Sequence, residues 1–207
     1  MKALHWERTL RGLREKNGRE FFRPTELANI AQTPAGFIAV EIARLAAAGV
    51  LVRYAHGVYG LPGARDIRQL VGAIDPGAYI TGAAALHFHG LVSQEISNRS
   101  CFTNRRHNRS RVRVTPLGTF TFICVAPPVY SPPGESGYAS PAQALCDFVY
   151  IMRRHGALPE SVATMKIPGS VSEDDIRSVS LRYPRTVAAH VESILADPAL
   201  RVKLAVA

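Results

Sequence analysis

The sequence has few cysteines, and they lie far apart. Cys101, Cys124 and Cys146 are odd in number, and each has an apolar neighbour in the sequence. A disulfide framework needs paired cysteines, and a zinc site needs closely spaced Cys and His ligands. The pattern therefore argues against both and favours a reducing compartment.

Long hydrophobic runs are also missing. No stretch approaches the roughly 20 apolar residues that a membrane-spanning helix needs. The first 16 residues are charged throughout and contain no apolar signal core. The sequence therefore predicts a cytoplasmic protein without a membrane partner.

The sequence lacks the patterns of a catalytic, metal or nucleotide site. The glycine patterns of phosphate loops and dinucleotide folds do not occur. His87 and His89 are two apart on a predicted helix, about 200° around its axis, so they cannot face one metal. Cys146 and Asp147 are helix neighbours that point about 100° apart, and Cys146 falls in an apolar stripe. We therefore expect no cofactor, no metal and no enzymatic activity.

Acidic residues are outnumbered. The 207 residues include 25 Lys and Arg against 16 Asp and Glu, which gives a formal net charge of +9. A basic protein commonly meets a polyanion, and nucleic acid is the commonest one. The alternative is a surface that is simply rich in arginine. Nearly half of the residues are hydrophobic, so the chain can bury the cores of two small domains.

The N-terminal part is predicted to contain three helices. Apolar residues are spaced for an amphipathic helix over residues 4–16, and Pro24 opens a second helix through Ile30. Thr33 is predicted to cap a third helix that runs to residue 48, with Pro34 in its first turn. Its apolar residues Ile38, Ile42 and Leu45 form one buried stripe.

A small hairpin is predicted directly after these helices. Residues 50–54 and 58–61 are strand-like, and His56-Gly57 lies in the turn between them. Helices followed by a hairpin, with only a few residues between the second and third helix, are typical of a winged helix-turn-helix. We assign residues 1–63 to this domain.

The remaining residues, 64–207, are predicted to form a second α/β domain. Helices are expected over residues 66–73, 81–88, 140–156, 172–182 and 186–195, and strands over residues 95–103, 111–115 and 120–125. Strands that follow one another closely favour antiparallel pairing. The predicted fold class is therefore α+β: an N-terminal winged helix-turn-helix and a C-terminal α/β domain with a small, mostly antiparallel sheet.

Three segments resemble the AbiEi family, the antitoxins of type IV toxin–antitoxin systems. Residues 57–63 read GVYGLPG, close to the GVYxLPG at the end of the family's wing. Residues 79–91 resemble its YIS…AL…HGL segment, and residues 139–147 resemble its ASPEKALLD segment. The segments occur in the family's order, and the similarity extends from about Phe22 to Tyr150.

The resemblance implies a winged helix that represses its own operon by binding inverted repeats in operator DNA. A dimer, or two copies on the repeats, is needed for a site of useful size. It also implies a C-terminal domain that neutralises a nucleotidyltransferase-like toxin without forming a stable complex with it.

The candidate DNA-binding residues fall in three places. The predicted recognition helix has only Arg44 as a positive charge, so we expect Thr33 and backbone amides to bind phosphate, and small residues such as Ala35 to touch thymine methyl groups. The predicted wing contributes Arg53 and His56. Six arginines and no acid occur between residues 98 and 113; Arg105, Arg106 and Arg109 fall in a predicted hairpin turn, and Arg111 and Arg113 on the polar face of a strand.

Two alternatives remain open. The weakly basic third helix also suits a winged-helix module that docks on protein, and the arginines also suit a non-specific nucleic-acid binder. An enzyme that acts on nucleic acid would need acids or metal ligands near the basic segment, which the sequence does not provide.

Overall fold

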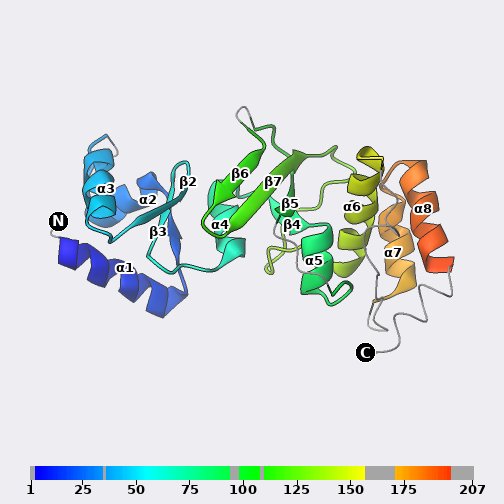
Figure 1. Cartoon of the computed structure of the whole chain (residues 1–207), viewed down its shortest axis with the longest axis horizontal. Helices are drawn as coiled ribbons and strands as arrows, with labels where there is room; N and C mark the ends of the chain where they lie inside the picture. Colours follow the sequence, from blue (N-terminus) through cyan, green and yellow to red (C-terminus); the bar gives the residue numbers. More distant parts are fainter. Residues whose placement is uncertain (1–2, 35, 94–97, 108–109, 157–170, 197–207) are drawn as a thin grey trace. The chain divides into compact units, whose positions relative to one another are not determined.

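The computed structural model describes residues 3–34, 36–93, 98–107, 110–156 and 171–196, and has mixed α+β structure. The chain divides into two compact units (Figure 1). Unit 1 comprises Met1–Pro76 and Val114–Leu117, and unit 2 comprises Gly77–Arg113 and Gly118–Ala207.

Three helices of unit 1 share one apolar core. They are α1 (Ala3–Asn17), α2 (Pro24–Ala31) and α3 (Ile38–Ala47), so the three predicted N-terminal helices are confirmed. Trp6 and Leu10 of α1 are fully buried, and Leu45 of α3 lies in the same cluster. The indole Nε1 of Trp6 also donates a 2.8 Å hydrogen bond to Glu41 of α3. Apolar packing and this bond together place α1 on α3.

The start of the third helix was predicted wrongly. α3 begins at Ile38, and Thr33 belongs to the end of α2 instead. Gln32 adopts a left-handed conformation, with φ 50°, and the amide of Thr33 donates to the carbonyl of Ala28 at 3.0 Å. This bond supplies a donor to a carbonyl in the last turn of α2, as in a Schellman cap.

The predicted hairpin of unit 1 is present and gains a third strand. β2 (Val52–Ala55) and β3 (Val58–Gly60) pair antiparallel, and Gly57 takes the positive φ of 70° that the turn requires. β1 (Phe21–Phe22) pairs with the other edge of β3, which gives the order β1-β3-β2. Two residues are too few to show a strand period, so the sequence did not predict β1.

Unit 1 extends past the predicted boundary at residue 63. The fourth helix, α4 (Ile67–Ile74), is capped by the Asp66 side chain and belongs to unit 1. Buried Glu20 accepts hydrogen bonds from the amides of Arg65 and Asp66 at 2.6 and 2.8 Å, and Arg23 donates to the carbonyl of Ala73 at 2.8 Å. These bonds tie α4 to the residues around β1, so the compact unit ends at Pro76.

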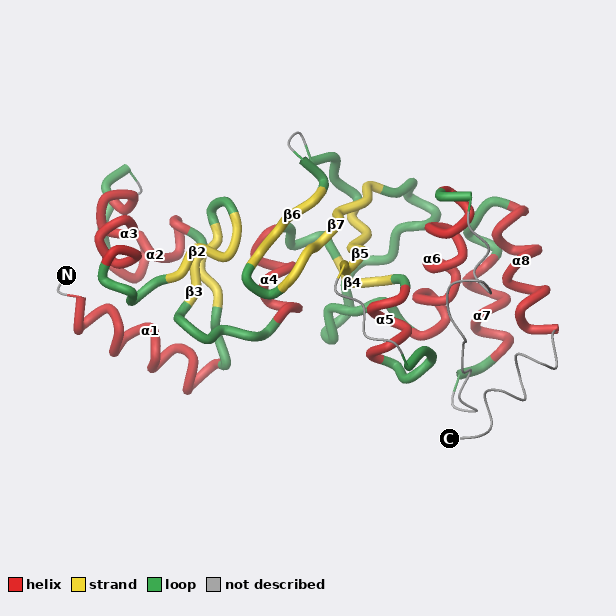
Figure 2. Tube along the Cα trace, in the orientation of Figure 1, coloured by secondary structure: helices red, strands yellow, loops and turns green. Residues whose placement is uncertain are grey.

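The four-stranded sheet has a parallel pair at its centre. The strands are β4 (Tyr79–Thr81), β5 (Asn98–Thr103), β6 (Val112–Thr115) and β7 (Gly118–Cys124), in the order β4-β5-β7-β6 (Figure 2). β5 and β7 run parallel over six residue pairs, from Asn98–Thr119 to Thr103–Cys124. β4 and β5 pair antiparallel, as predicted, so the sheet is mixed. The parallel pair was not predicted, because β7 lies between β5 and β6, which follow each other in sequence.

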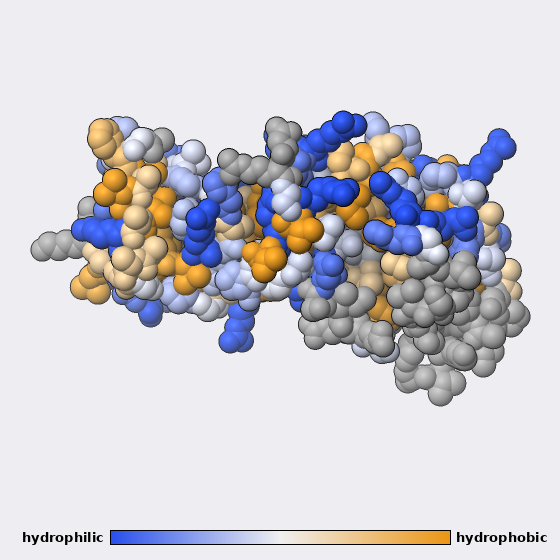
Figure 3. All heavy atoms as spheres, turned by 45° about the horizontal axis from the view of Figure 1, so that its top comes forward, coloured by the Kyte–Doolittle hydropathy of each residue, from blue (hydrophilic) through white to orange (hydrophobic). Residues whose placement is uncertain are grey.

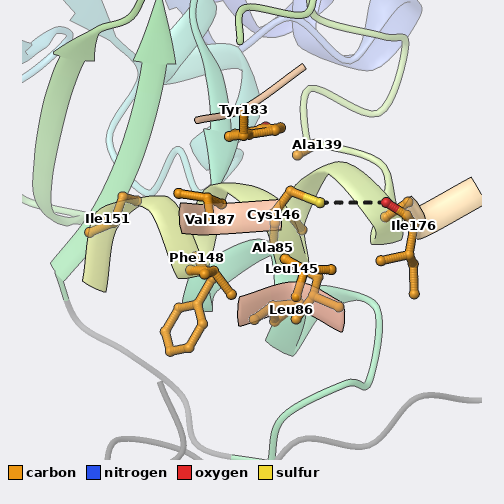
Figure 4. Close-up of a cluster of buried hydrophobic side chains, with 14 of the residues drawn as sticks. Ala85, Leu86, Ala139, Leu145, Cys146, Phe148, Ile151, Ile176, Tyr183 and Val187 are labelled. Carbon is orange, nitrogen blue, oxygen red and sulfur yellow. Dashed lines mark hydrogen bonds between the residues drawn. The ribbon is translucent and has the colours of Figure 1, made fainter. Parts of the chain in front are cut away.

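Four helices complete unit 2. They are α5 (Ala83–Phe88), α6 (Pro141–Arg154), α7 (Glu173–Ser180) and α8 (Arg185–Ala196). Ser140 caps α6 and accepts from the amide of Gln143, as its sequence pattern predicts. Residues 142–149 of α6 are all buried, and this helix packs against α5, α7 and α8 (Figure 4). Thr81, predicted as the cap of α5, lies in β4, and Gly82 takes the cap position.

Among the described helices, none is long and apolar enough to cross a membrane.

Gly60 in β3 provides a test of the packing in unit 1. A Cβ atom at this position would lie 2.8 Å from the carbonyl oxygen of Glu20 and 3.1 Å from the rings of Phe21 and Tyr54. Because the backbone of Glu20 cannot easily move, we expect Gly60→Ala to lower the free energy of unfolding by about 1–3 kcal/mol.

The matched control is Gly12→Ala in the interior of α1, where a Cβ meets nothing within 4 Å. This change should raise stability by about 0.5–1 kcal/mol, because alanine has the better helix propensity. Urea denaturation measures both variants. Equal stability of Gly60→Ala and the parent protein would contradict the packing described for β1 and β3.

Candidate nucleic-acid interface

The exposed face of α3 is apolar. Its buried stripe, Ile38, Ile42 and Leu45, is the predicted one. On the opposite side Phe37 and Val40 are 72% and 77% exposed, and the other exposed residues of the helix are Ala39, Ala43, Arg44, Ala46 and Ala47. Figure 3 shows orange spheres gathered where α3 lies.

Arg44 is the basic residue of this helix, and it is engaged by an acid. Its guanidinium lies 2.7 Å from the carboxylate of Glu41, which also accepts the hydrogen bond from Trp6. Burial, which acts to raise the pKa of Glu41, is outweighed by these hydrogen bonds and by the charge of Arg44, so the pKa is lowered. The helix therefore presents little net charge. Thr33 is half-buried in the α2 cap, and Ala35 lies outside the described residues.

The turn between β2 and β3 carries two basic side chains. Arg53 and His56 are both exposed, and one guanidinium nitrogen of Arg53 lies 2.9 Å from Nδ1 of His56. Arg53 also donates to the carbonyl of Ala55 at 3.4 Å. These two contacts hold the guanidinium near the tip of the hairpin.

The arginine segment of unit 2 connects two strands that are not neighbours. Residues 104–111 lead from β5 to β6, which β7 separates, so the prediction of a hairpin turn was wrong. Arg105 and Arg106 are exposed, and Arg109 lies outside the described residues. Of the described carboxylates, none forms an ion pair with Arg105 or Arg106 at salt-bridge distance.

Arginines alternate with valines around β6, and the arginines were predicted to lie on the polar face of the strand. Val112 and Val114 are nevertheless exposed as well, Val114 to 81%. Arg113 is half-buried and donates to the carbonyls of Ser110 and Val112, whereas Arg111 is exposed. β6 is an edge strand of the sheet, and both of its valines are exposed.

Asp147 of α6 stands at the centre of a buried hydrogen-bond network. Its Oδ2 accepts from the hydroxyl of Thr81 at 2.5 Å, and its Oδ1 accepts from the hydroxyl of Tyr183 and from the amide of Gln143. Arg182 donates to the amide oxygen of Gln143 in turn. The network joins β4, α6 and the connection between α7 and α8.

Burial controls the protonation of this carboxyl group. Removal from water raises the pKa of Asp147 to about 7, against hydrogen bonds from Thr81, Tyr183 and Gln143 that act to lower it. Such a shift is common at catalytic sites, but it also occurs in structural networks. The chemistry of the neighbouring groups decides between the two.

The groups near Asp147 do not form a catalytic set. Burial raises the pKa of the Cys146 thiol to about 12, so the thiol stays protonated, and its Sγ faces the carbonyl of Ile176 at 3.8 Å among apolar side chains (Figure 4). His89 contacts the carbonyl of Ala139, and His87 that of Val92. Within the described ranges no three His, Cys, Asp or Glu side chains are grouped as a metal site requires. The hydrogen bonds of Asp147 link β4, α6 and the connection between α7 and α8.

The sequence contained a signal for this network that was not used. Thr81 falls in the second AbiEi-like segment, and Gln143 and Asp147 fall in the third, four residues apart on one helix face. The two segments thus meet through their polar residues. Because Gln143 and Asp147 lie on a predicted apolar helix, the sequence could have indicated that both need polar partners. It could not have indicated which residues those partners are.

No protein-family model matches the chain, and no curated protein is detectably similar to it. The likeness to the AbiEi family rests on the three sequence segments alone.

The Asp147 network predicts a specific pH dependence of stability. The pKa of Asp147 rises from its ordinary value of 3.8 in the unfolded chain to about 7 in the fold, so the folded protein binds the extra proton between these values. Its contribution to stability is complete below about pH 4 and is lost as the pH rises to 7, with a slope of roughly 1 kcal/mol per pH unit.

Asp147→Asn should remove this part of the slope, because the amide does not titrate. Asp174→Asn changes an exposed carboxyl group of α7 and is the matched control; it should keep the slope of the parent protein. Urea unfolding at several pH values between 4 and 8 measures the slopes. Parallel curves for Asp147→Asn and the parent protein would contradict the shifted pKa.

Proposed function

We propose that this chain is a DNA-binding transcriptional regulator that represses its own operon. The observation that carries the proposal is the arrangement of unit 1. Its elements occur in the order α1, β1, α2, α3, β2, β3, and β3 lies between β1 and β2 in the sheet. A short turn joins α2 to α3, and a hairpin follows at once. This arrangement fits a winged helix-turn-helix, in which α3 enters the major groove.

The charges of unit 1 support a docking surface for a phosphate backbone. Arg53 and His56 lie at the tip of the hairpin, where a wing contacts DNA. Phe37, the residue before α3, has no side-chain acceptor for the amides of the first turn, so these amides remain suited to a phosphate oxygen. In unit 2, Arg105 and Arg106 add exposed positive charge that suits non-specific phosphate contacts.

The role as an antitoxin follows from the resemblance to the AbiEi family. In this proposal the operator contains inverted repeats, and two copies of the chain bind them, because one winged helix covers too short a site for useful specificity. The functional partner is a nucleotidyltransferase-like toxin that forms no stable complex with the chain. Unit 2 carries the second and third AbiEi-like segments and is the part assigned to neutralising it.

A protein-docking role is the second candidate. The observation in its favour is the exposed apolar face of α3 around Phe37 and Val40. Salt separates the two roles, because binding through several phosphates weakens steeply as salt rises, and apolar docking does not.

The test is a gel-shift titration of the full chain with the duplex immediately upstream of its gene, against a random duplex of equal length at two salt concentrations. We expect tighter binding to the upstream duplex and strong weakening at the higher salt. Arg53→Ala and Arg105→Ala should each reduce the slope of log affinity against log salt by about one, because each removes one phosphate contact.

Arg11→Ala is the matched control, because Arg11 is an exposed arginine of α1 that already pairs with Glu7 at 2.7 Å. It should leave the salt slope unchanged. Equal affinity for the upstream and random duplexes would reduce the chain to a non-specific binder. Absence of binding to either duplex would overturn the regulator and favour protein docking.

A further inference from the structure

We infer that α3 reads its operator through the methyl groups of thymine, rather than through hydrogen bonds to base edges. The inference rests on the proposed DNA-binding function and specifies how it recognises sequence. It starts from the spacing of the exposed residues. Phe37, Val40, Arg44 and Ala47 recur at intervals of three and four, so they lie on one face of the helix.

The side chains of this face are unsuited to hydrogen-bonded readout. Direct reading of guanine or adenine uses Arg, Lys, Asn or Gln. Of these four residue types, α3 contains only Arg44. Its guanidinium lies 2.7 Å from the carboxylate of Glu41. Glu41 is itself held by the indole of Trp6 at 2.8 Å, so this pair is anchored to the core through α1.

The same side chains suit one apolar feature of the major groove. The C5 methyl group of thymine is the apolar group that base pairs present there, and it is read by Ala, Phe and similar side chains. Phe37 and Val40 are exposed to 72% and 77%, and Ala43 and Ala47 continue the face along the helix. Small and apolar residues let the helix approach the base edges closely.

Charge favours DNA over a protein as the occupant of this face. The acid of α3, Glu41, is already engaged by Trp6 and Arg44, so no uncompensated carboxylate of the helix would repel phosphate. Unit 1 also carries the exposed Arg53 and His56 at the hairpin tip. An apolar face accompanied by basic side chains complements a groove whose floor has methyl groups and whose walls are phosphates.

The experiment compares the upstream duplex with a copy in which uracil replaces every thymine, a change that removes the methyl groups and keeps the base pairing. Burial of one methyl group corresponds to about fourfold in affinity. Several methyl contacts should therefore make the uracil duplex bind at least about tenfold more weakly, while a random duplex should show little difference between its two forms.

Variants of α3 show whether this helix is responsible. Phe37→Ala and Val40→Ala should weaken binding to the thymine duplex and leave binding to the uracil duplex almost unchanged, because their partners are missing there. Val114→Ala in β6 is the matched control: it trims a valine that is 81% exposed on another element, and it should not change the preference. Circular dichroism verifies that each variant is folded.

Each other outcome overturns the inference in a distinguishable way. Equal affinity for thymine and uracil duplexes, with the upstream duplex still preferred over random DNA, would refute methyl reading and keep the regulator. Equal losses on both duplexes in the α3 variants would assign the methyl contacts to another element. Failure to bind the upstream duplex would overturn the proposed function as well. A changed oligomeric mass of the variants, without a change in DNA preference, would make this face an interface between copies.

Discussion

Apolar packing of Trp6 with the buried stripe of α3, together with its hydrogen bond to Glu41, determines which face of α3 is turned outward. Trp6 is fully buried, and its indole reaches across from α1 to the side of α3 between the buried stripe and the exposed face. The carboxylate of Glu41 then also holds Arg44. The carboxylate of Glu41 therefore links α3 to α1 and also neutralises the charge of Arg44. The outward face that remains is apolar, and both candidate functions of unit 1 depend on this face.

Unit 2 is organised around a different constraint, the buried carboxyl group of Asp147. An isolated charge in an apolar core is costly, and here the donors Thr81, Gln143 and Tyr183 compensate part of that cost. Each donor comes from a different part of the unit's chain: β4, α6 and the connection before α8. The network therefore specifies how these elements meet, which apolar packing alone would leave less well determined.

Local patterns predicted much of this fold, and long-range pairing explains most of the errors. The stripe Ile38, Ile42, Leu45 and the turn at Gly57 depend on neighbours in sequence, and both are confirmed. The parallel pair β5·β7 and the bond from Thr81 to Asp147, 66 residues away, depend on partners that one sequence does not reveal. The prediction that Thr33 caps α3 was wrong for a local reason. The amide of Thr33 takes part in the C-terminal cap of α2 instead. The sequence did show that α3 has a single basic residue, but it could not show that Glu41 engages it.

In the proposed function, α3 and the hairpin tip of unit 1 form the surface that meets DNA. Hydrogen exchange of the full chain, measured by mass spectrometry with and without the upstream duplex, tests this proposal. We expect exchange to slow in peptides covering the start of α3 and residues 53–58, which run from β2 through the turn to the first residue of β3. Slowing confined to residues 98–113 of unit 2, or no slowing on a duplex that binds, would contradict it.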